Sequence, residues 1–171
     1  MNELVVADAG PLIALGLVDA IEALAQLHRV VLVPHIVRAE CTARPDKPAA
    51  VTIEQAFSRN YLRPQPDHVL LSNDPIGTLD AGESAAIELA ERLSARVLID
   101  ERRGRAVARA RGLSVVGTVA VLIAARRKGL VPELRQTFDR LATGGYYLSQ
   151  ALVTAALVQV GERDDPAARS N

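Results

Sequence analysis

The chain has 171 residues, 49% of them hydrophobic, so one ordinary core can bury its apolar side chains and we expect a single domain over residues 1–161. Its one cysteine, Cys41, excludes a disulfide scaffold and is interpreted as a small buried apolar residue. The formal net charge of zero argues against a protein held to nucleic acid by bulk charge, yet residues 1–100 carry −6 and residues 101–171 carry +6.

The sequence lacks the signs of export or membrane insertion. The first three residues contain no basic region, and no sustained apolar run precedes Asp8. The longest charge-free helical segment, residues 113–125, is shorter than the roughly 18 apolar residues of a membrane span. We therefore expect a soluble, cytoplasmic protein that does not enter a membrane.

Short apolar runs alternate with helical patterns from residue 4 onward. Residues 4–7 predict a strand, and Pro11 suits the first turn of the helix that follows. Asp19, with Glu22 three residues later, is typical of a capping box that begins a second helix ending near His28. Further strands are predicted at residues 30–33, 96–99 and 113–116, and further helices at residues 34–43, 48–60, 82–93, 102–110, 119–128, 132–141 and 149–160. This alternation predicts an α/β fold with a mainly parallel sheet covered by helices.

Three segments depart from this regular pattern. Residues 61–81 contain several prolines and form the least regular stretch, with a short strand expected near residues 69–71. The helix at residues 149–160 is apolar nearly all round, so we expect it to be buried in the chain's own core, the alternative being contact with a second subunit. The polar residues 162–171 are predicted to form a disordered tail.

Acidic side chains stand where two predicted strands end. Asp8 ends the first strand and Asp100 ends the strand at residues 96–99, with Glu101 directly after it. Carboxyl ends of parallel strands meet at one edge of the sheet, where functional groups gather. Two carboxylates about 5 Å apart repel by roughly 3 kcal/mol, so an ionised cluster needs a cation or a shared proton. Oxygen ligands suit Mg²⁺ or Mn²⁺, whereas three scattered histidines and one cysteine argue against zinc.

Each acid also has an explanation without catalysis. A strand-end aspartate often caps the following helix, and for Asp8 and Asp100 this alternative stands level with a catalytic role. Glu83 follows Asp80 by three residues just before an apolar helix, so a capping box explains that pair. Glu40, taken alone, is most simply a solvated glutamate.

Motifs of competing activities are missing from the sequence. It contains no Gly-x-x-x-x-Gly-Lys-Ser/Thr, no Gly-x-Gly-x-x-Gly after the first strand and no Gly-x-Ser-x-Gly. The only lysines are Lys47 and Lys128, and neither ends a predicted strand as a phosphoacceptor receiver domain would need. These absences argue against nucleotide-binding, serine-hydrolase and receiver functions.

Five segments together carry a resemblance to a known family. They are Val-Val-Ala-Asp8-Ala-Gly-Pro-Leu-Ile, Val-Pro-His-Ile-Val-Arg-Ala-Glu40, Gly-Glu83-Ser-Ala-Ala-Ile-Glu-Leu-Ala, Val-Leu-Ile-Asp100-Glu101 and Val-Gly-Thr118-Val-Ala-Val-Leu. In this order they resemble the PIN domain, the nuclease fold that includes the VapC-type toxins of toxin-antitoxin pairs, over roughly residues 4–145.

The resemblance implies a three-layer α/β/α fold and metal-dependent endonucleolytic cleavage of RNA. It implies three or four carboxylates that bind Mg²⁺ or Mn²⁺, frequent homodimers and, for the toxin branch, a small antitoxin that blocks the site. The implied acids map onto Asp8, Glu40, Glu83 and Asp100, with Glu101 as an alternative to Asp100. Glu83 departs from the pattern, because many toxin-type members have aspartate there.

On this interpretation each of the matched residues has an expected role. Asp8 and Asp100 bind one metal ion directly, Glu40 and Glu83 complete its shell, and Thr118 orients a carboxylate or a water, an N-cap being equally compatible. Residues 102–140 hold ten basic and two acidic side chains, a bias that favours a polyanion. Backbone phosphates are predicted to contact Arg102, Arg103 and Arg105, the alternative for each being a solvated helix face.

The function predicted from the sequence is a metal-dependent endoribonuclease, the toxin component of a toxin-antitoxin pair. The alternative is a catalytically degenerate PIN-like protein that acts by binding a protein or RNA partner. Retention of all four acids favours the first prediction.

Overall fold

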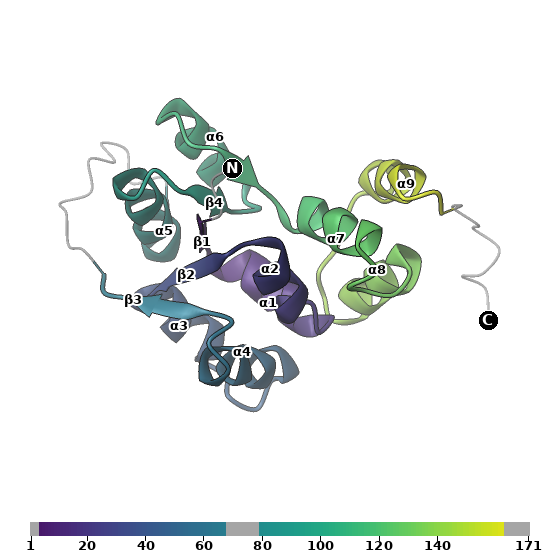
Figure 1. Ribbon diagram of the computed structural model, residues 1–171, viewed down its shortest axis with the longest axis horizontal. Helices are drawn as coiled ribbons and strands as arrows, with labels where there is room; N and C mark the ends of the chain where they lie inside the picture. The colour runs from purple at the N-terminus through teal and green to yellow at the C-terminus, as the bar shows by residue number, and fades with distance from the viewer. Residues whose placement is uncertain (1–3, 68–78, 163–171) are drawn as a thin grey trace.

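Five strands form one parallel sheet in the computed structural model, which describes residues 4–67 and 79–162 (Figure 1). The strands are β1 (Leu4–Ala7), β2 (Val30–Pro34), β3 (Arg63–Gln65), β4 (Arg96–Leu98) and β5 (Val115–Val116), in the order β3-β2-β1-β4-β5. In the centre of the sheet, Val5 is in register with Val31 on one side and with Arg96 on the other. The predicted parallel sheet is therefore confirmed.

The helices follow the strands in the predicted alternation. They are α1 (Ala9–Leu17), α2 (Ile21–Leu27), α3 (His35–Thr42), α4 (Pro48–Ser58), α5 (Ala81–Arg92), α6 (Arg102–Ala110), α7 (Thr118–Arg127), α8 (Leu134–Thr143) and α9 (Gln150–Gln159).

The capping box predicted before α2, formed by Asp19 and Glu22, is wrong. Asp19 has a positive φ of 57°, Ala20 is the N-cap, and the Asp19 carboxylate instead accepts a hydrogen bond from Arg140 at 2.6 Å.

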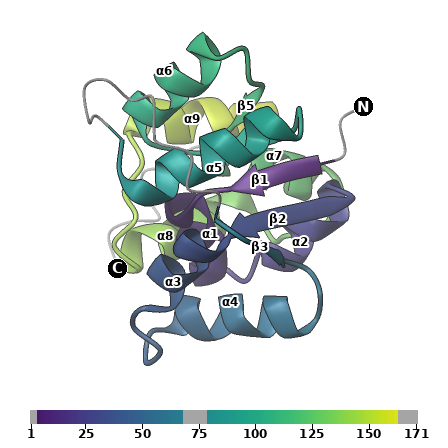
Figure 2. The same ribbon diagram turned by 90° about the vertical axis from the view of Figure 1, so that its left-hand side faces the viewer.

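Helices cover both faces of the sheet, which confirms the three-layer α/β/α architecture (Figure 2). Side chains alternate along each strand, so neighbours point to opposite faces. Val6, Val97 and Ile99 pack in the cluster beneath α5 and α6. Val5 and Val33 pack in a larger cluster with residues of α1 to α4 and α7 to α9, which also contains the buried Cys41.

Helix α9 is only partly buried, contrary to the prediction. Val153, Ala156 and Leu157 are buried against the larger core cluster. On the opposite side, Leu152 is 43% exposed and Val158 is 72% exposed. The reason is that α9 lies outside α7 and α8. One face of α9 packs against these two helices, and the other faces away from the core (Figure 1).

Strand β3 lies in the stretch that the sequence predicted to be irregular. Its register places Arg63 opposite Leu32, at the edge of the sheet. Arg63 and Pro64 are not typical strand residues, but an edge strand tolerates both because only one of its sides must form hydrogen bonds with a neighbouring strand. The strand predicted near residues 69–71 and residues 163–171 of the predicted tail lie outside the described residues.

No single described helix is long and apolar enough to cross a membrane. Helices α1 and α2 reach that length only together, with a bend of 117° between them. Both helices contribute residues to the core.

Glu162 joins the end of the described chain to two helices. Its carboxylate accepts hydrogen bonds from the backbone N–H groups of Leu134 and Arg135, both at 3.0 Å, and from Arg126 Nε at 2.8 Å. Burial alone would raise the pKa of Glu162, but these donors outweigh it and lower the pKa below its usual value. The first turn of α8 thus depends on a side chain 28 residues further along the chain.

We expect Glu162→Gln to lower the free energy of unfolding by roughly 1.5–3 kcal/mol at neutral pH, the range for hydrogen bonds to charged groups. Because the folded-state pKa is lowered, this stability is present above the unfolded-state value and is lost as pH falls through the folded-state pKa. Urea unfolding of both chains at several pH values measures this difference in the free energy of unfolding. Glu133→Gln is the control, since Glu133 is exposed and its side chain makes no capping bond. Equal losses in both variants would contradict the prediction.

Candidate active site

Asp8 lies at the carboxyl end of β1 and is 7% exposed. Its backbone N–H donates to the carbonyl of Leu98 at 3.0 Å, which ties the end of β1 to β4. Asp8 occupies the N-cap position of α1, but its side chain makes no capping hydrogen bond there. The alternative that Asp8 serves as a helix cap is therefore not supported by the geometry.

The carboxylate of Asp8 belongs to an acidic cluster. Burial, together with the charges of Asp80, Glu83 and Glu40, raises its pKa to about 7 against the lowering effect of the Ala9 N–H. Glu40 shows the same pattern, with burial first and then Asp80 and Glu83 raising its pKa. The structure thus brings together three of the predicted acids and adds Asp80, which the sequence assigned only to capping.

Glu83 combines a capping role with membership of the cluster. The predicted capping box is present, because Glu83 N–H donates to Asp80 Oδ1 at 2.7 Å and Asp80 N–H donates to Glu83 Oε2 at 3.2 Å. Glu83 is 5% exposed, and burial, Asp80 and Glu101 raise its pKa against the effect of the Asp80 N–H. Capping therefore fixes one oxygen of Glu83 and leaves Oε1 facing α6 next to Gly104.

Asp100 is held by three hydrogen bonds at the end of β4. Thr118 donates twice, from its backbone N–H to Oδ1 at 2.9 Å and from Oγ1 to Oδ2 at 2.6 Å. Tyr146 Oη donates to Oδ2, also at 2.6 Å, and the partial burial of Tyr146, followed by this bond, raises the pKa of its hydroxyl. Thr118 orients a carboxylate, as predicted, whereas the N-cap of α7 is Gly117.

Tyr146 was missed by the sequence analysis. It comes from the link between α8 and α9, 46 residues beyond Asp100. The Gly-Gly-Tyr-Tyr segment has no helical or strand periodicity, so its sequence signals only a turn. Glu101, the alternative ligand, is the exposed N-cap of α6 and acts electrostatically on Glu83.

Glycines allow three carboxylates to approach the starts of helices. A Cβ atom on Gly82 would collide with the carboxylate of Glu40, and one on Gly117 would lie 3.0 Å from Asp100 Oδ1. A Cβ atom on Gly104 would lie 3.0 Å from Glu83 Oε1 and would collide with Ile99. The positive ends of α5, α6 and α7 therefore face the acids, an arrangement that favours negative charge.

Gly104→Ala is expected to destabilise the fold by about 1–3 kcal/mol, because Ile99 is fully buried and cannot move away without strain. Gly10→Ala provides the matched control in the first turn of α1. Its added Cβ would lie 4.0 Å from Asp8 Oδ2, an ordinary contact, and alanine favours a helix. Urea unfolding compares the two variants. A Gly104→Ala chain as stable as Gly10→Ala would refute the tight packing of α6 on β4.

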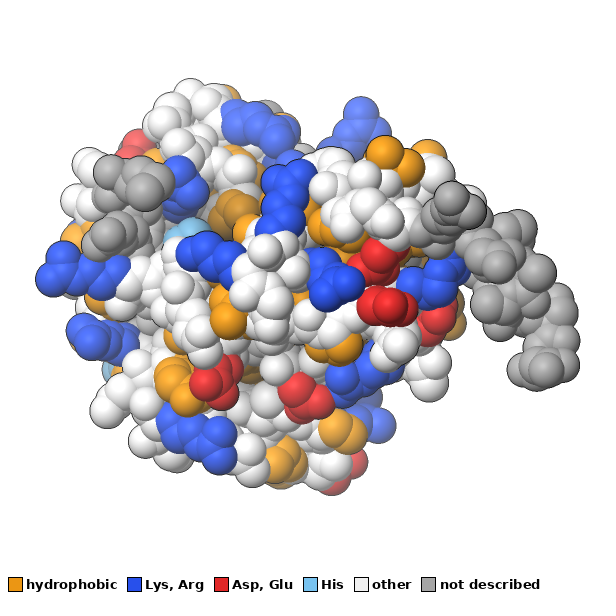
Figure 3. Space-filling view, turned by 45° about the vertical axis from the view of Figure 1, so that its right-hand side comes forward, with side chains coloured by type: hydrophobic (Ala, Val, Ile, Leu, Met, Phe, Trp, Pro, Cys, Tyr) orange, Lys and Arg blue, Asp and Glu red, His pale blue; other side chains and the backbone are white. Residues whose placement is uncertain are grey.

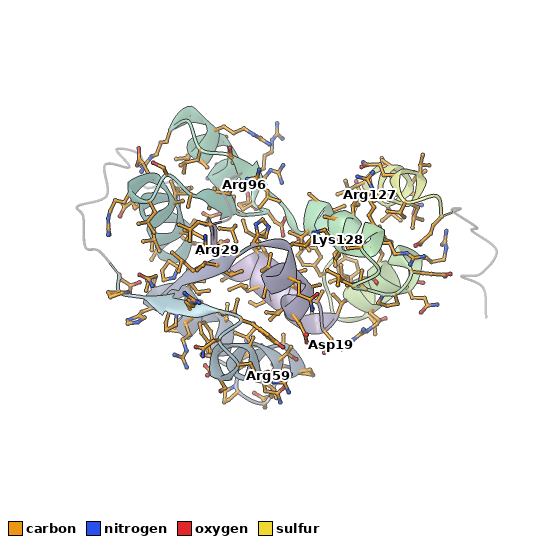
Figure 4. The ribbon with its side chains drawn as sticks, viewed as in Figure 1. Asp19, Arg29, Arg59, Arg96, Arg127 and Lys128 are labelled. Carbon is orange, nitrogen blue, oxygen red and sulfur yellow. The ribbon has the colours of Figure 1, made fainter. Side chains whose placement is uncertain are left out.

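Basic side chains are arranged differently at the two edges of the sheet. At the carboxyl edge, Arg105 is half-buried, and its Nη1 lies next to Gly117 and Asp100, whereas Arg102 and Arg103 are exposed in the first turn of α6. At the opposite edge, Arg96 begins β4, Arg29 precedes β2, and Arg59 and Lys128 cap the carboxyl ends of α4 and α7 (Figure 4). Such cations favour helix C-termini.

The donor chemistry of the cluster suits a hard divalent cation, but its geometry is not that of a preformed site. All candidate ligands are carboxylates, and the pKa values of Asp8, Glu40 and Glu83 are raised by burial and by the negative charge of neighbouring acids, Asp80 among them in each case. A bound cation would relieve that repulsion. Within residues 4–67 and 79–162, no group of three or more Asp, Glu, His or Cys side chains is already placed to hold a metal ion.

The fold and the acids at its carboxyl edge define an α/β protein with a carboxylate site at a topological switch point. A family model described as a PIN domain matches residues 4–162. The chain belongs to the PIN-domain family, as the motifs indicated, and membership indicates a function of the nuclease type. Neither a curated protein nor a solved structure gives a significant match to the chain.

Proposed function

We propose that this chain is a Mg²⁺- or Mn²⁺-dependent endoribonuclease that hydrolyses RNA phosphodiester bonds and forms the toxin component of a toxin-antitoxin pair in the cytoplasm. The observation that carries the proposal is the acidic cluster at the carboxyl edge of a PIN-family sheet, in which the buried Asp8 and Glu83 lie beside the exposed Glu40 and Asp80 and the pKa of Asp8 is raised to about 7. Buried carboxylates set among other acids destabilise the fold, so a function explains Asp8 and Glu83 better than structure does.

The residues that would hold the metal ion are Asp8 and Asp100 directly, with Glu40 and Glu83 completing the shell. When bound, a divalent cation supplies positive charge for the phosphate and lowers the pKa of a coordinated water. Glu101 remains a further candidate ligand through its position beside Glu83. The side chains must close around the ion, because the described residues hold no ready-made ligand group.

The chain's own residues orient the site. Thr118 and Tyr146 donate to Asp100 and keep its carboxylate in one orientation. Arg105 lies beside that carboxylate and would contact a substrate phosphate, with Arg102 and Arg103 extending the positive charge along the first turn of α6. These groups bind and position the RNA, while the acids position the attacking water.

A second candidate function is binding without cleavage. The observation that favours it is the lack of a preformed metal-ligand group among the described residues. An antitoxin protein or a second copy of the chain would then be the partner, and the exposed apolar side chains Leu152 and Val158 of α9 would offer contact area. Homodimer formation and antitoxin binding are parts of this proposal under either function.

A Mn²⁺ titration by calorimetry tests the metal site without any assumption about substrate. The wild-type chain is compared with a folded Asp8→Asn, Asp100→Asn double variant, and an RNA-cleavage assay with Mn²⁺ or with chelator follows. We expect saturable binding that the double variant loses and cleavage that the chelator stops. Failure to cleave RNA with Mn²⁺ bound would favour the binding function. Metal binding unchanged in the double variant would refute the assignment of these acids.

A further inference from the structure

A groove begins at Asp100 and follows helix α7 along the edge of the sheet. Its volume is about 720 Å³, within the range of ligand sites. The strand β5 and one face of α7 form its floor, with Val116, Val119 and Ile123, and the segment 146–149 with Leu152 forms the opposite wall. It extends to Arg127, nine residues along α7 from Thr118 and so roughly 13 Å away.

The groove brings together two of the chain's three tyrosines, in a protein without tryptophan. Tyr146 is fixed by its hydrogen bond to Asp100. The next residue, Tyr147, is 82% exposed, the highest exposure among the large hydrophobic side chains of the described residues. Both tyrosines line the groove, so it offers an exposed aromatic ring to a ligand. Nucleobases stack on such rings.

The charge of the groove matches a polyanion. Arg105 lines it at the Asp100 end and Arg127 lines it further along α7. Both arginines belong to residues 102–140, which carry ten basic and two acidic side chains. Figure 3 shows basic side chains distributed among apolar ones over the face that carries the C-terminal helices. Apolar floor, exposed aromatic ring and flanking arginines are the parts of a single-strand binding surface.

We propose that this groove binds single-stranded RNA next to the cleaved bond, with one base stacked on Tyr147 and backbone phosphates at Arg105 and Arg127. The inference rests on the proposed ribonuclease function and locates the substrate of the same acidic site. Double-stranded RNA does not fit this site, because its base faces are already stacked within the helix. Asp100 lines the groove, so a strand bound along it would pass this carboxylate.

The test uses full-length Asp8→Asn protein, whose cleavage is expected to be strongly reduced, and a 12-nucleotide single-stranded RNA of mixed sequence carrying a fluorophore. Tyr147→Ala should weaken binding by roughly 5- to 100-fold, as expected for one lost stacking contact, and Tyr147→Phe should retain it. Because Tyr147 is largely exposed, neither change should impair folding. Arg105→Ala should reduce the slope of log RNA affinity against log salt concentration by about one, as expected for one lost phosphate contact. Photocrosslinking of RNA containing 5-iodouridine should attach it to Tyr147.

The outcomes separate this inference from the proposed function. Weaker RNA binding by Tyr147→Ala, together with the crosslink, supports it. Unchanged RNA binding by Tyr147→Ala, or a crosslink outside residues 146–149, overturns the inference, while cleavage by the wild-type chain would leave the ribonuclease proposal standing. A wild-type chain that binds Mn²⁺ but neither binds nor cleaves RNA overturns both.

Discussion

Replacement of Asp8 by asparagine should make the metal-free protein more stable above neutral pH and remove the stabilisation that Mn²⁺ gives to the wild-type chain. Asp8 is buried, and burial together with Asp80, Glu83 and Glu40 raises its pKa to about 7. At higher pH the wild-type chain must keep an ionised carboxylate in an acidic, poorly hydrated position. Asparagine has the same shape without the charge.

The pH dependence of this effect has a definite sign. The folded-state pKa of Asp8 is raised above its unfolded value of 3.8, so the proton stabilises the fold at low pH and this stability is lost as pH rises through about 7. The full loss is at most about 4 kcal/mol, since one pKa unit corresponds to roughly 1.4 kcal/mol. Asp8→Asn should therefore match the wild type near pH 4 and exceed its stability at pH 8.

Chemical unfolding at pH 4, 6 and 8, with and without Mn²⁺, measures both effects. Mn²⁺ at 100 times its dissociation constant should stabilise the wild type by about 2.7 kcal/mol and leave Asp8→Asn unchanged. Cleavage of RNA should fall by roughly 10²–10³-fold, as for the loss of one preorganised electrostatic group. Asp139→Asn, an exposed acid on α8, is the control and should change stability by less than about 0.5 kcal/mol. Equal pH profiles for wild type and Asp8→Asn would exclude a strained carboxylate at this position.

The positions of these acids could be predicted because local sequence determines where strands end. Asp8 and Asp100 each follow a short apolar run, and parallel strands bring their carboxyl ends to one edge of the sheet. The capping box of Asp80 and Glu83 was also predictable, because its two residues interact within a single turn. The same spacing wrongly predicted a capping box for Asp19 and Glu22. Asp19 has a left-handed backbone conformation, and its carboxylate is bound by Arg140 of α8.

Interactions between distant segments could not be predicted from the sequence. The hydroxyl of Tyr146 reaches Asp100 only because α8 and α9 pack back against α7. The half-exposed position of α9 likewise depends on which helices lie next to it on the outside of the fold, since most of its side chains are apolar. Composition therefore indicates which helix faces are apolar enough to be buried, whereas tertiary packing determines which of those faces are buried in the folded chain.

Loss of the hydroxyl of Tyr146 should weaken metal binding without unfolding the chain. Asp100 accepts from Tyr146 Oη and Thr118 Oγ1 on the same oxygen, both at 2.6 Å, so these two donors limit the rotation of its carboxylate. A ligand that is free to rotate must be ordered when the ion binds. Removing such a supporting donor typically costs 10- to 100-fold in metal affinity. We expect a loss in this range for Tyr146→Phe.

The neighbouring tyrosine provides a matched control. Tyr147→Phe removes the same hydroxyl from an exposed side chain one residue away and should leave Mn²⁺ affinity unchanged. Thr118→Val should weaken Mn²⁺ binding as Tyr146→Phe does, whereas Thr118→Ser retains the hydroxyl and should restore most of the affinity. Calorimetric titration gives the affinities, and circular dichroism checks that each variant is folded.

The double variant Tyr146→Phe, Thr118→Val distinguishes positioning from general packing. Because both hydroxyls act on one carboxylate oxygen, their effects on Mn²⁺ affinity should not be additive, with a coupling in the range of 0.5–3 kcal/mol expected for groups in one hydrogen-bond network. Additive losses, or an equal loss in Tyr147→Phe, would show that the link between α8 and α9 affects the metal only through the stability of the fold. A non-additive loss would establish that residues after Thr118 complete a site whose four main acids come from the first 100 residues.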